Sequence, residues 1–305
     1  LLSSLGVTGS GWIEVESTLP VVGLLNFDDY ANRMGSMSGV TPASAIYFPH
    51  FHQDPSWQTY YAIVNPSDTP ASITITYYGA DGSVMSTESS TLNPRSKIGR
   101  FTVSGSGWIA VQSDTLIVGM LNFDDYHNRM GTIEHAVPSS TLYFPHFHMD
   151  ASWQTFYALA NPSGSSASIT VTYYREDGSI ITTDTSTLGA HCKFGRFAVA
   201  GTGWIKVEST SWIVGMLNFD DYHNRMGSIV AVTPQSSIVF PHFHQDSSWE
   251  TFYAIVNIGP SATFTVTYYG AEGTTITSTS TSIDANGKIG RFATSGTGWL
   301  RVRQA

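Results

Sequence analysis

Apolar and polar residues alternate along much of this chain with a period of two. Residues 72–78 read Ser-Ile-Thr-Ile-Thr-Tyr-Tyr, the pattern of a strand that is buried on one face and exposed on the other. The Asp-Gly pair at Asp81 follows this run and predicts a hairpin turn. No stretch shows the period of a helix, so the pattern predicts an all-β protein with further strands over 45–51, 59–64, 84–90, 97–103, 108–112 and 116–123.

The same pattern occurs three times. Asn-Phe-Asp-Asp-Tyr and Phe-Pro-His-Phe-His each recur at intervals of 96 residues, starting at Asn26, Asn122 and Asn218 and at Phe48, Phe144 and Phe240. Gly-Trp-Ile/Leu-x-Val occurs four times, from Gly11, Gly107, Gly203 and Gly298. A cut after this segment gives units 19–114, 115–210 and 211–305, each with seven or eight expected strands. We therefore predict three tandem antiparallel β-sandwiches.

This division leaves one copy of the Gly-Trp strand over, in residues 1–18. One interpretation is that the chain is a piece of a longer array. The other is that the strand completes a neighbouring unit, either within the chain to close a ring or between chains by strand addition.

Composition favours a secreted protein. Apolar residues make up 41% of the chain and charged residues only 12%, about half the usual share. The net charge is −9 and Lys and Arg are not clustered, so a nucleic-acid partner is not expected. The apolar run 19–27 is too short to span a membrane, and a lone cysteine, Cys192, cannot form an internal disulfide. We expect an extracellular or cell-surface location, although no signal peptide is visible.

The order of the motifs resembles that of a known group of repeats. Along the chain, Asn-Pro-Ser is followed by an alternating strand, Asp-Gly, a Ser/Thr-rich strand, Gly-Trp-Ile and then Tyr-Phe-Pro-His, and the third copy has Asn257-Ile258 in place of Asn-Pro. This resembles uncharacterised tandem β-sandwich repeats of bacterial secreted and cell-surface proteins. The resemblance implies an immunoglobulin-like sandwich and an extracytoplasmic setting, and it implies no activity.

A His-x-His-x-Asp motif is the first candidate site. If one strand runs through His50, His52 and Asp54, their side chains share a face, and such ligands could hold Zn²⁺ or Cu²⁺. The alternative is that hydrogen-bonded histidines lock the strand end to a loop. The other copies are His146, His148 and Asp150, and His242, His244 and Asp246.

Paired aspartates form the second candidate site. Asp28 and Asp29 precede Asn32 and Arg33, and carboxylates at this spacing could hold Ca²⁺. The nearby arginine instead favours Asp–Arg pairing that pins the loop. The equivalents are Asp124, Asp125 and Arg129, and Asp220, Asp221 and Arg225.

A tryptophan in a polar turn is the third candidate. Trp57 follows Pro-Ser and, if exposed, could stack on a sugar ring; packing at the edge of the core is the alternative. Its equivalents are Trp153 and Trp249.

An enzyme normally has one catalytic centre, whereas this chain repeats all of its candidate residues three times. We therefore expect no enzyme but an extracellular structural or adhesive repeat protein. It could be a filament subunit that assembles by strand addition, with itself or a cell-surface or matrix component as partner. The alternative is a metal- or carbohydrate-binding repeat protein, and a polysaccharide-active enzyme is less favoured.

Overall fold

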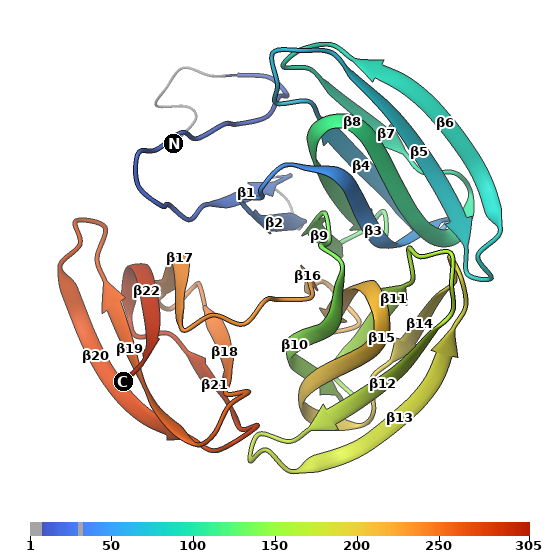
Figure 1. Ribbon diagram of the computed structural model, residues 1–305. Coiled ribbons are helices and arrows are strands. Elements are labelled where there is room, and N and C mark those ends of the chain that lie inside the picture. The colour runs from blue at the N-terminus through green and yellow to red at the C-terminus, as the bar shows by residue number, and fades with distance from the viewer. Residues whose placement is uncertain (1–7, 30–32) are drawn as a thin grey trace.

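The computed structural model describes residues 8–29 and 33–305. Its regular elements are all strands, which confirms the all-β prediction, and Figure 1 shows them arranged as a curved array around a central region. The N-terminal hairpin consists of β1 (Leu24–Asp28) and β2 (Met34–Ser38).

The remaining strands fall into three modules. The first module contains β3 (Ala43–Gln53), β4 (Gln58–Val64), β5 (Ala71–Gly79), β6 (Val84–Leu92), β7 (Lys97–Phe101), β8 (Gly105–Asp124) and β9 (Met130–Glu134). The second contains β10 (Ser139–Met149), β11 (Gln154–Ala160), β12 (Ala167–Tyr174), β13 (Ile180–Leu188), β14 (Lys193–Phe197), β15 (Gly201–Asp220) and β16 (Met226–Val230). The third contains β17 (Ser237–Gln245), β18 (Phe252–Val256), β19 (Ala262–Tyr269), β20 (Thr275–Ile283), β21 (Lys288–Phe292) and β22 (Gly296–Gln304).

The first and second modules are complete antiparallel sandwiches. In the first, one sheet has the order β3-β8-β5-β6 and the other has the order β9-β8-β4-β7. The two inner faces enclose an apolar core that includes Ile46, Phe51, Tyr61 and Ile75. The second module repeats this topology with its own core, so the sandwich prediction is confirmed.

Strand β8 belongs to both sheets of its module. Its first half, up to Ser113, pairs with β5, and its second half, from Val118, pairs with β4. The sequence pattern suggested two strands here, over 108–112 and 116–123, and the structure joins them into one of 20 residues. The expected unit boundary between residues 114 and 115 lies inside this strand, where it passes from one sheet to the other.

Two glycines occupy positions where a side chain would not fit without strain, and Gly82 lies in the turn that the Asp-Gly pair predicted. Gly82 has φ 84° in the turn between β5 and β6, a conformation that glycine adopts without steric cost. A Cβ atom at Gly119 would lie 2.6 Å from the Ile46 side chain, so this position allows β8 to pack closely against the opposite sheet.

The two ends of the array differ from the middle. In the third module β18 pairs with β21 in a two-stranded sheet, while β17, β22, β19 and β20 form a four-stranded sheet. At the other end, the N-terminal hairpin is a two-stranded sheet by itself.

Residues 8–18, the N-terminal Gly-Trp segment, form no strand, although a strand was expected there. The reason is that the described chain offers this segment no neighbours equivalent to β3 and β5, which flank the corresponding part of β8.

Candidate assembly site at the module junctions

The candidate metal ligands do not lie together on one regular strand. Strand β3 ends at Gln53, so Asp54 lies in the following turn, and the pairing of β3 with β8 shifts between Phe48 and Phe51. The rings of His50 and His52 remain neighbours, with centroids 6.4 Å apart, so it is the position of Asp54 and the separate partners of the two histidines that break up the expected ligand set. Over the described ranges, no group of three His, Cys, Asp or Glu side chains could hold a metal ion.

The outer histidine of each motif pairs with the aspartate. His52 Nε2 lies 2.8 Å from Asp54 Oδ2, and the other carboxylate oxygen accepts the backbone N–H groups of Ser56 and Trp57. These hydrogen bonds, with the histidine contact first, lower the pKa of Asp54. The same histidine–aspartate distance of 2.8 Å recurs between His148 and Asp150 and between His244 and Asp246. In all three modules this pair fastens the turn that follows the strand.

The inner histidine instead contacts the next module. His50 Nδ1 lies 2.5 Å from Nζ of Lys193, at the start of β14. His146 Nδ1 lies 2.8 Å from Nζ of Lys288, at the start of β21. Lys193 is only 7% exposed and Lys288 only 3%, so each junction contains a buried lysine–histidine pair.

Burial controls the charge of these pairs, because a low dielectric disfavours charged forms. Burial lowers the pKa of Lys193 to about 7. Burial, together with the neighbouring lysine, lowers the pKa of His50 well below its usual value and that of His146 to about 3. Burial also lowers the pKa of Lys288, against the opposing effect of Glu176. The histidines are therefore neutral at pH 7 and accept a hydrogen bond from the lysine.

The tryptophan of each Gly-Trp motif makes a second junction contact. Trp108 Nε1 donates to His191 O at 2.7 Å, and Trp204 Nε1 donates to Asn286 O at 2.8 Å. Both accepting residues have positive φ, 56° and 58°, which turns their carbonyl groups out of the loop. Trp108 also stacks on Tyr78 and packs with Ala160 and Val214 of the second module. The junction is thus an apolar contact with directed hydrogen bonds.

The N-terminal Gly-Trp segment makes the same contact on the first module. Trp12 Nε1 donates to Arg95 O at 3.1 Å, and Arg95 has φ 57°, as its equivalents do. Lys97, the counterpart of Lys193, donates to Ser10 Oγ and Gly11 O, both at 3.1 Å. This segment therefore occupies the place of a preceding module.

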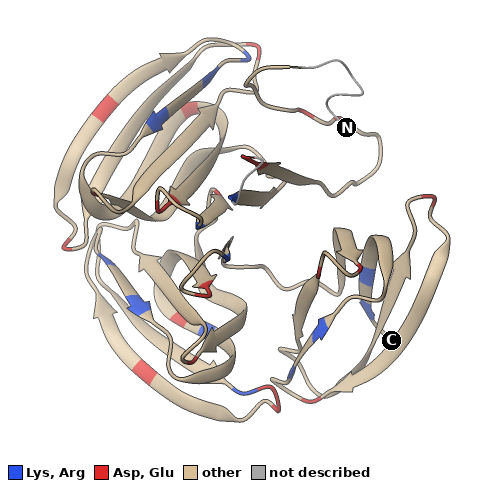
Figure 2. Ribbon diagram, turned by 180° about the vertical axis from the view of Figure 1, so that it is seen from behind, with Lys and Arg blue, Asp and Glu red and all other residues tan. Residues whose placement is uncertain are grey.

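The paired aspartates form the third junction contact, near the centre of the array. Asp125 Oδ1 accepts the backbone N–H groups of residues 127–129, and Arg129 Nε donates to Asp125 Oδ2 at 2.7 Å. Arg129 also reaches Asp220 of the second module at 3.5 Å, and Arg33 reaches Asp124 at 2.5 Å. Figure 2 shows acidic and basic residues together at these central loops in a molecule otherwise sparse in charge.

The turn tryptophans pack at the rim of their modules. Trp57 packs partly buried against the first core, with the Arg129 guanidinium 4.9 Å from its ring centre. Trp249 of the third module is 56% exposed. The arginine covers one face of Trp57, so among these tryptophans Trp249 offers the more open ring.

Comparison with known proteins adds little to this geometry. A family of unknown function (DUF5719) matches residues 34–99, less than half of the chain, and no curated protein matches. A crystal structure of a tetra-tandem repeat in the extending region of a large adhesion protein is 12% identical, with a TM-score of 0.16. That similarity covers 76% of this chain and 60% of the other.

Two β-glucuronidase structures are also similar at a low level. The Bacteroides uniformis β-glucuronidase 2, covalently bound to cyclophellitol-6-carboxylate aziridine, is 8% identical, with a TM-score of 0.15. That match covers 59% of this chain and 25% of the enzyme. A glycoside hydrolase family 2 β-glucuronidase is 8% identical, with a TM-score of 0.14 over 61% of this chain and 23% of the enzyme. Scores this low do not establish a shared fold.

Proposed function

We propose that this chain is a non-enzymatic, extracellular structural or adhesive protein whose repeated modules form a curved scaffold and associate with further copies. One observation carries the proposal. Side chains of the candidate sites and of the Gly-Trp motif join modules or fasten turns. His50, Trp108 and Arg129 each have their partner in the next module, at Lys193, His191 and Asp220.

The composition supports the same proposal. A surface with few charges and many Ser and Thr residues suits a secreted β protein, and the described chain contains no helix long and apolar enough to cross a membrane. Repetition of a modest contact surface lets weak contacts add through multivalency.

Negative-stain electron microscopy of the full chain, with sedimentation velocity over a range of concentrations, tests this function. We expect oligomers built from curved particles, in amounts that rise with concentration. Trp108→Ala should loosen the first junction and increase the radius of gyration in solution scattering, whereas Trp212→Ala, at an exposed position of β15, should not. Particles that remain monomeric at all concentrations would contradict the self-associating scaffold.

A further inference from the structure

Within residues 8–29 and 33–305, β18 of the third module has one neighbouring strand, whereas its counterparts β4 and β11 each have two. Strand β4 lies between β7 and the second half of β8, and β11 lies between β14 and the second half of β15. Among the described residues, β18 has only β21 as a neighbour. The missing piece corresponds to the second half of β8 together with β9.

The N-terminal hairpin has the form of this piece. Strands β1 and β2 pair Leu24 with Ser38 through to Asp28 with Met34, and β8 and β9 pair Met120 with Glu134 through to Asp124 with Met130 in the same register. In the part of the chain that the structure describes, β1 pairs with β2 alone, and its leucine side chains stay exposed. Val21 and Leu25 are 61% and 38% exposed, while the equivalent Ile117 and Leu121 are fully buried.

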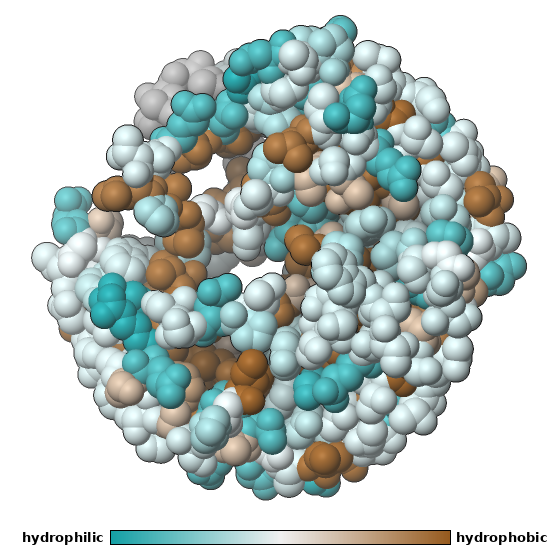
Figure 3. Space-filling view, viewed as in Figure 1, coloured by the Kyte–Doolittle hydropathy of each residue, from teal (hydrophilic) through white to brown (hydrophobic). Residues whose placement is uncertain are grey.

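We infer that the N-terminal hairpin of one copy adds to β18 of a second copy and joins the two molecules head to tail. This inference rests on the proposed scaffold function and names its partner. The register of the complete modules sets Leu25 opposite Tyr253, Leu24 opposite Ala254 and Val22 opposite Val256, as Leu121, Met120 and Val118 stand opposite Tyr61, Ala62 and Val64. Figure 3 shows apolar residues along the opening between the N-terminal segment and the third module.

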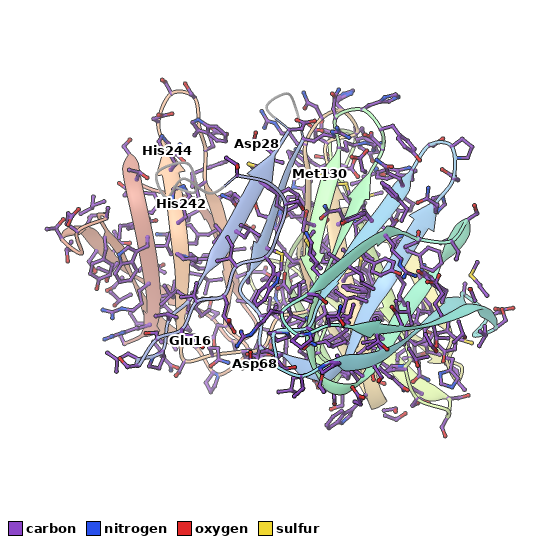
Figure 4. All side chains as sticks on the ribbon, turned by 90° about the horizontal axis from the view of Figure 1, so that it is seen from above. Glu16, Asp28, Asp68, Met130, His242 and His244 are labelled. Carbon is purple, nitrogen blue, oxygen red and sulfur yellow. The ribbon has the colours of Figure 1, made fainter. Side chains whose placement is uncertain are left out.

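Addition of the second copy also completes the other junction contacts at the third module. His242 is exposed, whereas His50 is held by Lys193, and the incoming copy brings Lys97 to this histidine. The Arg225 side chain is 71% exposed, against 20% for Arg129, and the incoming β1 ends at Asp28, the equivalent of Asp124. Figure 4 shows Asp28 at the same end of the molecule as His242 and His244.

A second copy explains the geometry better than closure of one chain on itself. The hairpin and β18 belong to the same molecule, yet they remain in separate two-stranded sheets. The hairpin is already fixed to the first module, with β2 against β9 as β9 is against β16. A second copy can be placed against the third module in the way that the second module lies against the first. This placement leaves the β2–β9 contact of each copy unchanged.

The N-terminal Gly-Trp segment then acts as a cap. Trp299 of the receiving copy is the equivalent of Trp108 and would donate to Arg95 O of the incoming copy. Trp12 of the incoming copy already occupies that carbonyl. The segment must leave when the copies join, so weakening its contact should favour assembly.

Cysteine cross-linking tests the contact. Cys192, the sole cysteine, is first replaced by serine, and Leu24→Cys and Ala254→Cys are introduced into separate full-length chains. Directly opposite residues of antiparallel strands have Cα atoms about 4.5–5.5 Å apart, which suits a disulfide. After mild oxidation of the mixture, we expect a disulfide dimer containing one chain of each kind. Val84→Cys, exposed on β6, replaces Leu24→Cys as the control and should give none.

The cap is tested by sedimentation of Trp12→Ala. Loss of one ordinary hydrogen bond should raise the association constant by about fivefold. A lower association constant for Trp12→Ala would overturn the capping role. It would instead indicate that the segment helps to connect two copies.

The outcomes separate this contact from the scaffold function. A chain that carries both cysteines and forms only an internal disulfide shows ring closure and overturns the head-to-tail contact. Polymers in the microscope without the mixed dimer leave the scaffold function in place and overturn this contact. Monomers without any cross-link overturn both.

Discussion

Lys193→Met removes a buried charge from the first junction while keeping a side chain of similar length. The pKa of Lys193 falls from an ordinary 10.5 to about 7 in the folded protein because of burial. Between these values the unfolded chain binds a proton that the folded chain does not, so stability rises with pH from about 7 to 10.5. At about 1.4 kcal/mol for each pKa unit, the full penalty below pH 7 is roughly 5 kcal/mol.

Methionine removes this penalty but also removes the hydrogen bond to His50. An acceptor left without a donor in a buried site costs about 1–3 kcal/mol. The variant should therefore be more stable than the wild type by about 2–4 kcal/mol at pH 6. The advantage should shrink with rising pH and reverse near pH 10, where Lys193 is neutral in the folded protein and the penalty relative to the unfolded chain has fallen to about 1 kcal/mol.

Urea unfolding followed by tryptophan fluorescence measures this effect between pH 6 and pH 9.5. Trp108 reports on the same junction, since it is buried against the second module. Lys97→Met is the matched control, because Lys97 holds the same position in the first module but contacts the N-terminal Gly-Trp segment. If Lys193→Met keeps the wild-type slope of stability against pH, or if Lys97→Met changes it equally, the buried-charge explanation is refuted.

Further changes test other parts of the molecule. Tyr77→Phe should cost about 1–2 kcal/mol by leaving the buried Tyr61 hydroxyl without its 2.7 Å partner. Burial raises the pKa of Tyr77, so the Tyr61–Tyr77 hydroxyl pair stabilises the fold fully below pH 10 and to a smaller extent above it. Urea unfolding at pH 8 and pH 11 measures the cost of the substitution and its dependence on pH. Asn65→Ala should cost about 2–4 kcal/mol in the same assay, because the buried Asn65 amide donates to three backbone carbonyl groups. The free energy of unfolding of the wild type should fall as the pH is lowered from 6.5 to about 3. In this range His146 gains a proton in the unfolded chain but not in the folded protein. His146→Asn should reduce this loss, and His148→Asn, on the exposed histidine, should not. Dialysis against zinc followed by metal analysis should leave less than one ion per chain, and one ion per module would restore the metal-binding alternative.

The strands and the repeat could be predicted because they depend on local pattern. Residues 72–78, where apolar and polar residues alternate, lie in β5, and the Asp81-Gly82 pair lies in the turn after it. The period of 96 residues is the spacing between equivalent positions in successive modules. Strand β9 was missed because it is short and follows a polar loop. Its formation depends on the second half of β8, with which it pairs.

The junctions could not be predicted, because their partners lie far apart in the sequence. His50 and Lys193 are 143 residues apart, and no spacing within one unit connects them. A signal was nevertheless present. Lysine recurs in the three copies at Lys97, Lys193 and Lys288, in a chain with only 14 Lys and Arg residues. The register shift in β3 between Phe48 and Phe51 was equally invisible in the sequence.

Duplication copies both halves of a joint into every module, and this explains why the repeated residues looked like binding sites. A joint needs a donor on one face and an acceptor on the other, so Trp108 and the carbonyl of His191 must recur together. Among the described residues, the N-terminal hairpin and Lys97 present one half of this contact, and β18, His242 and Trp299 present the other. Complementary ends of this kind suit growth by addition of identical copies, and the cap over Arg95 sets how readily that growth begins.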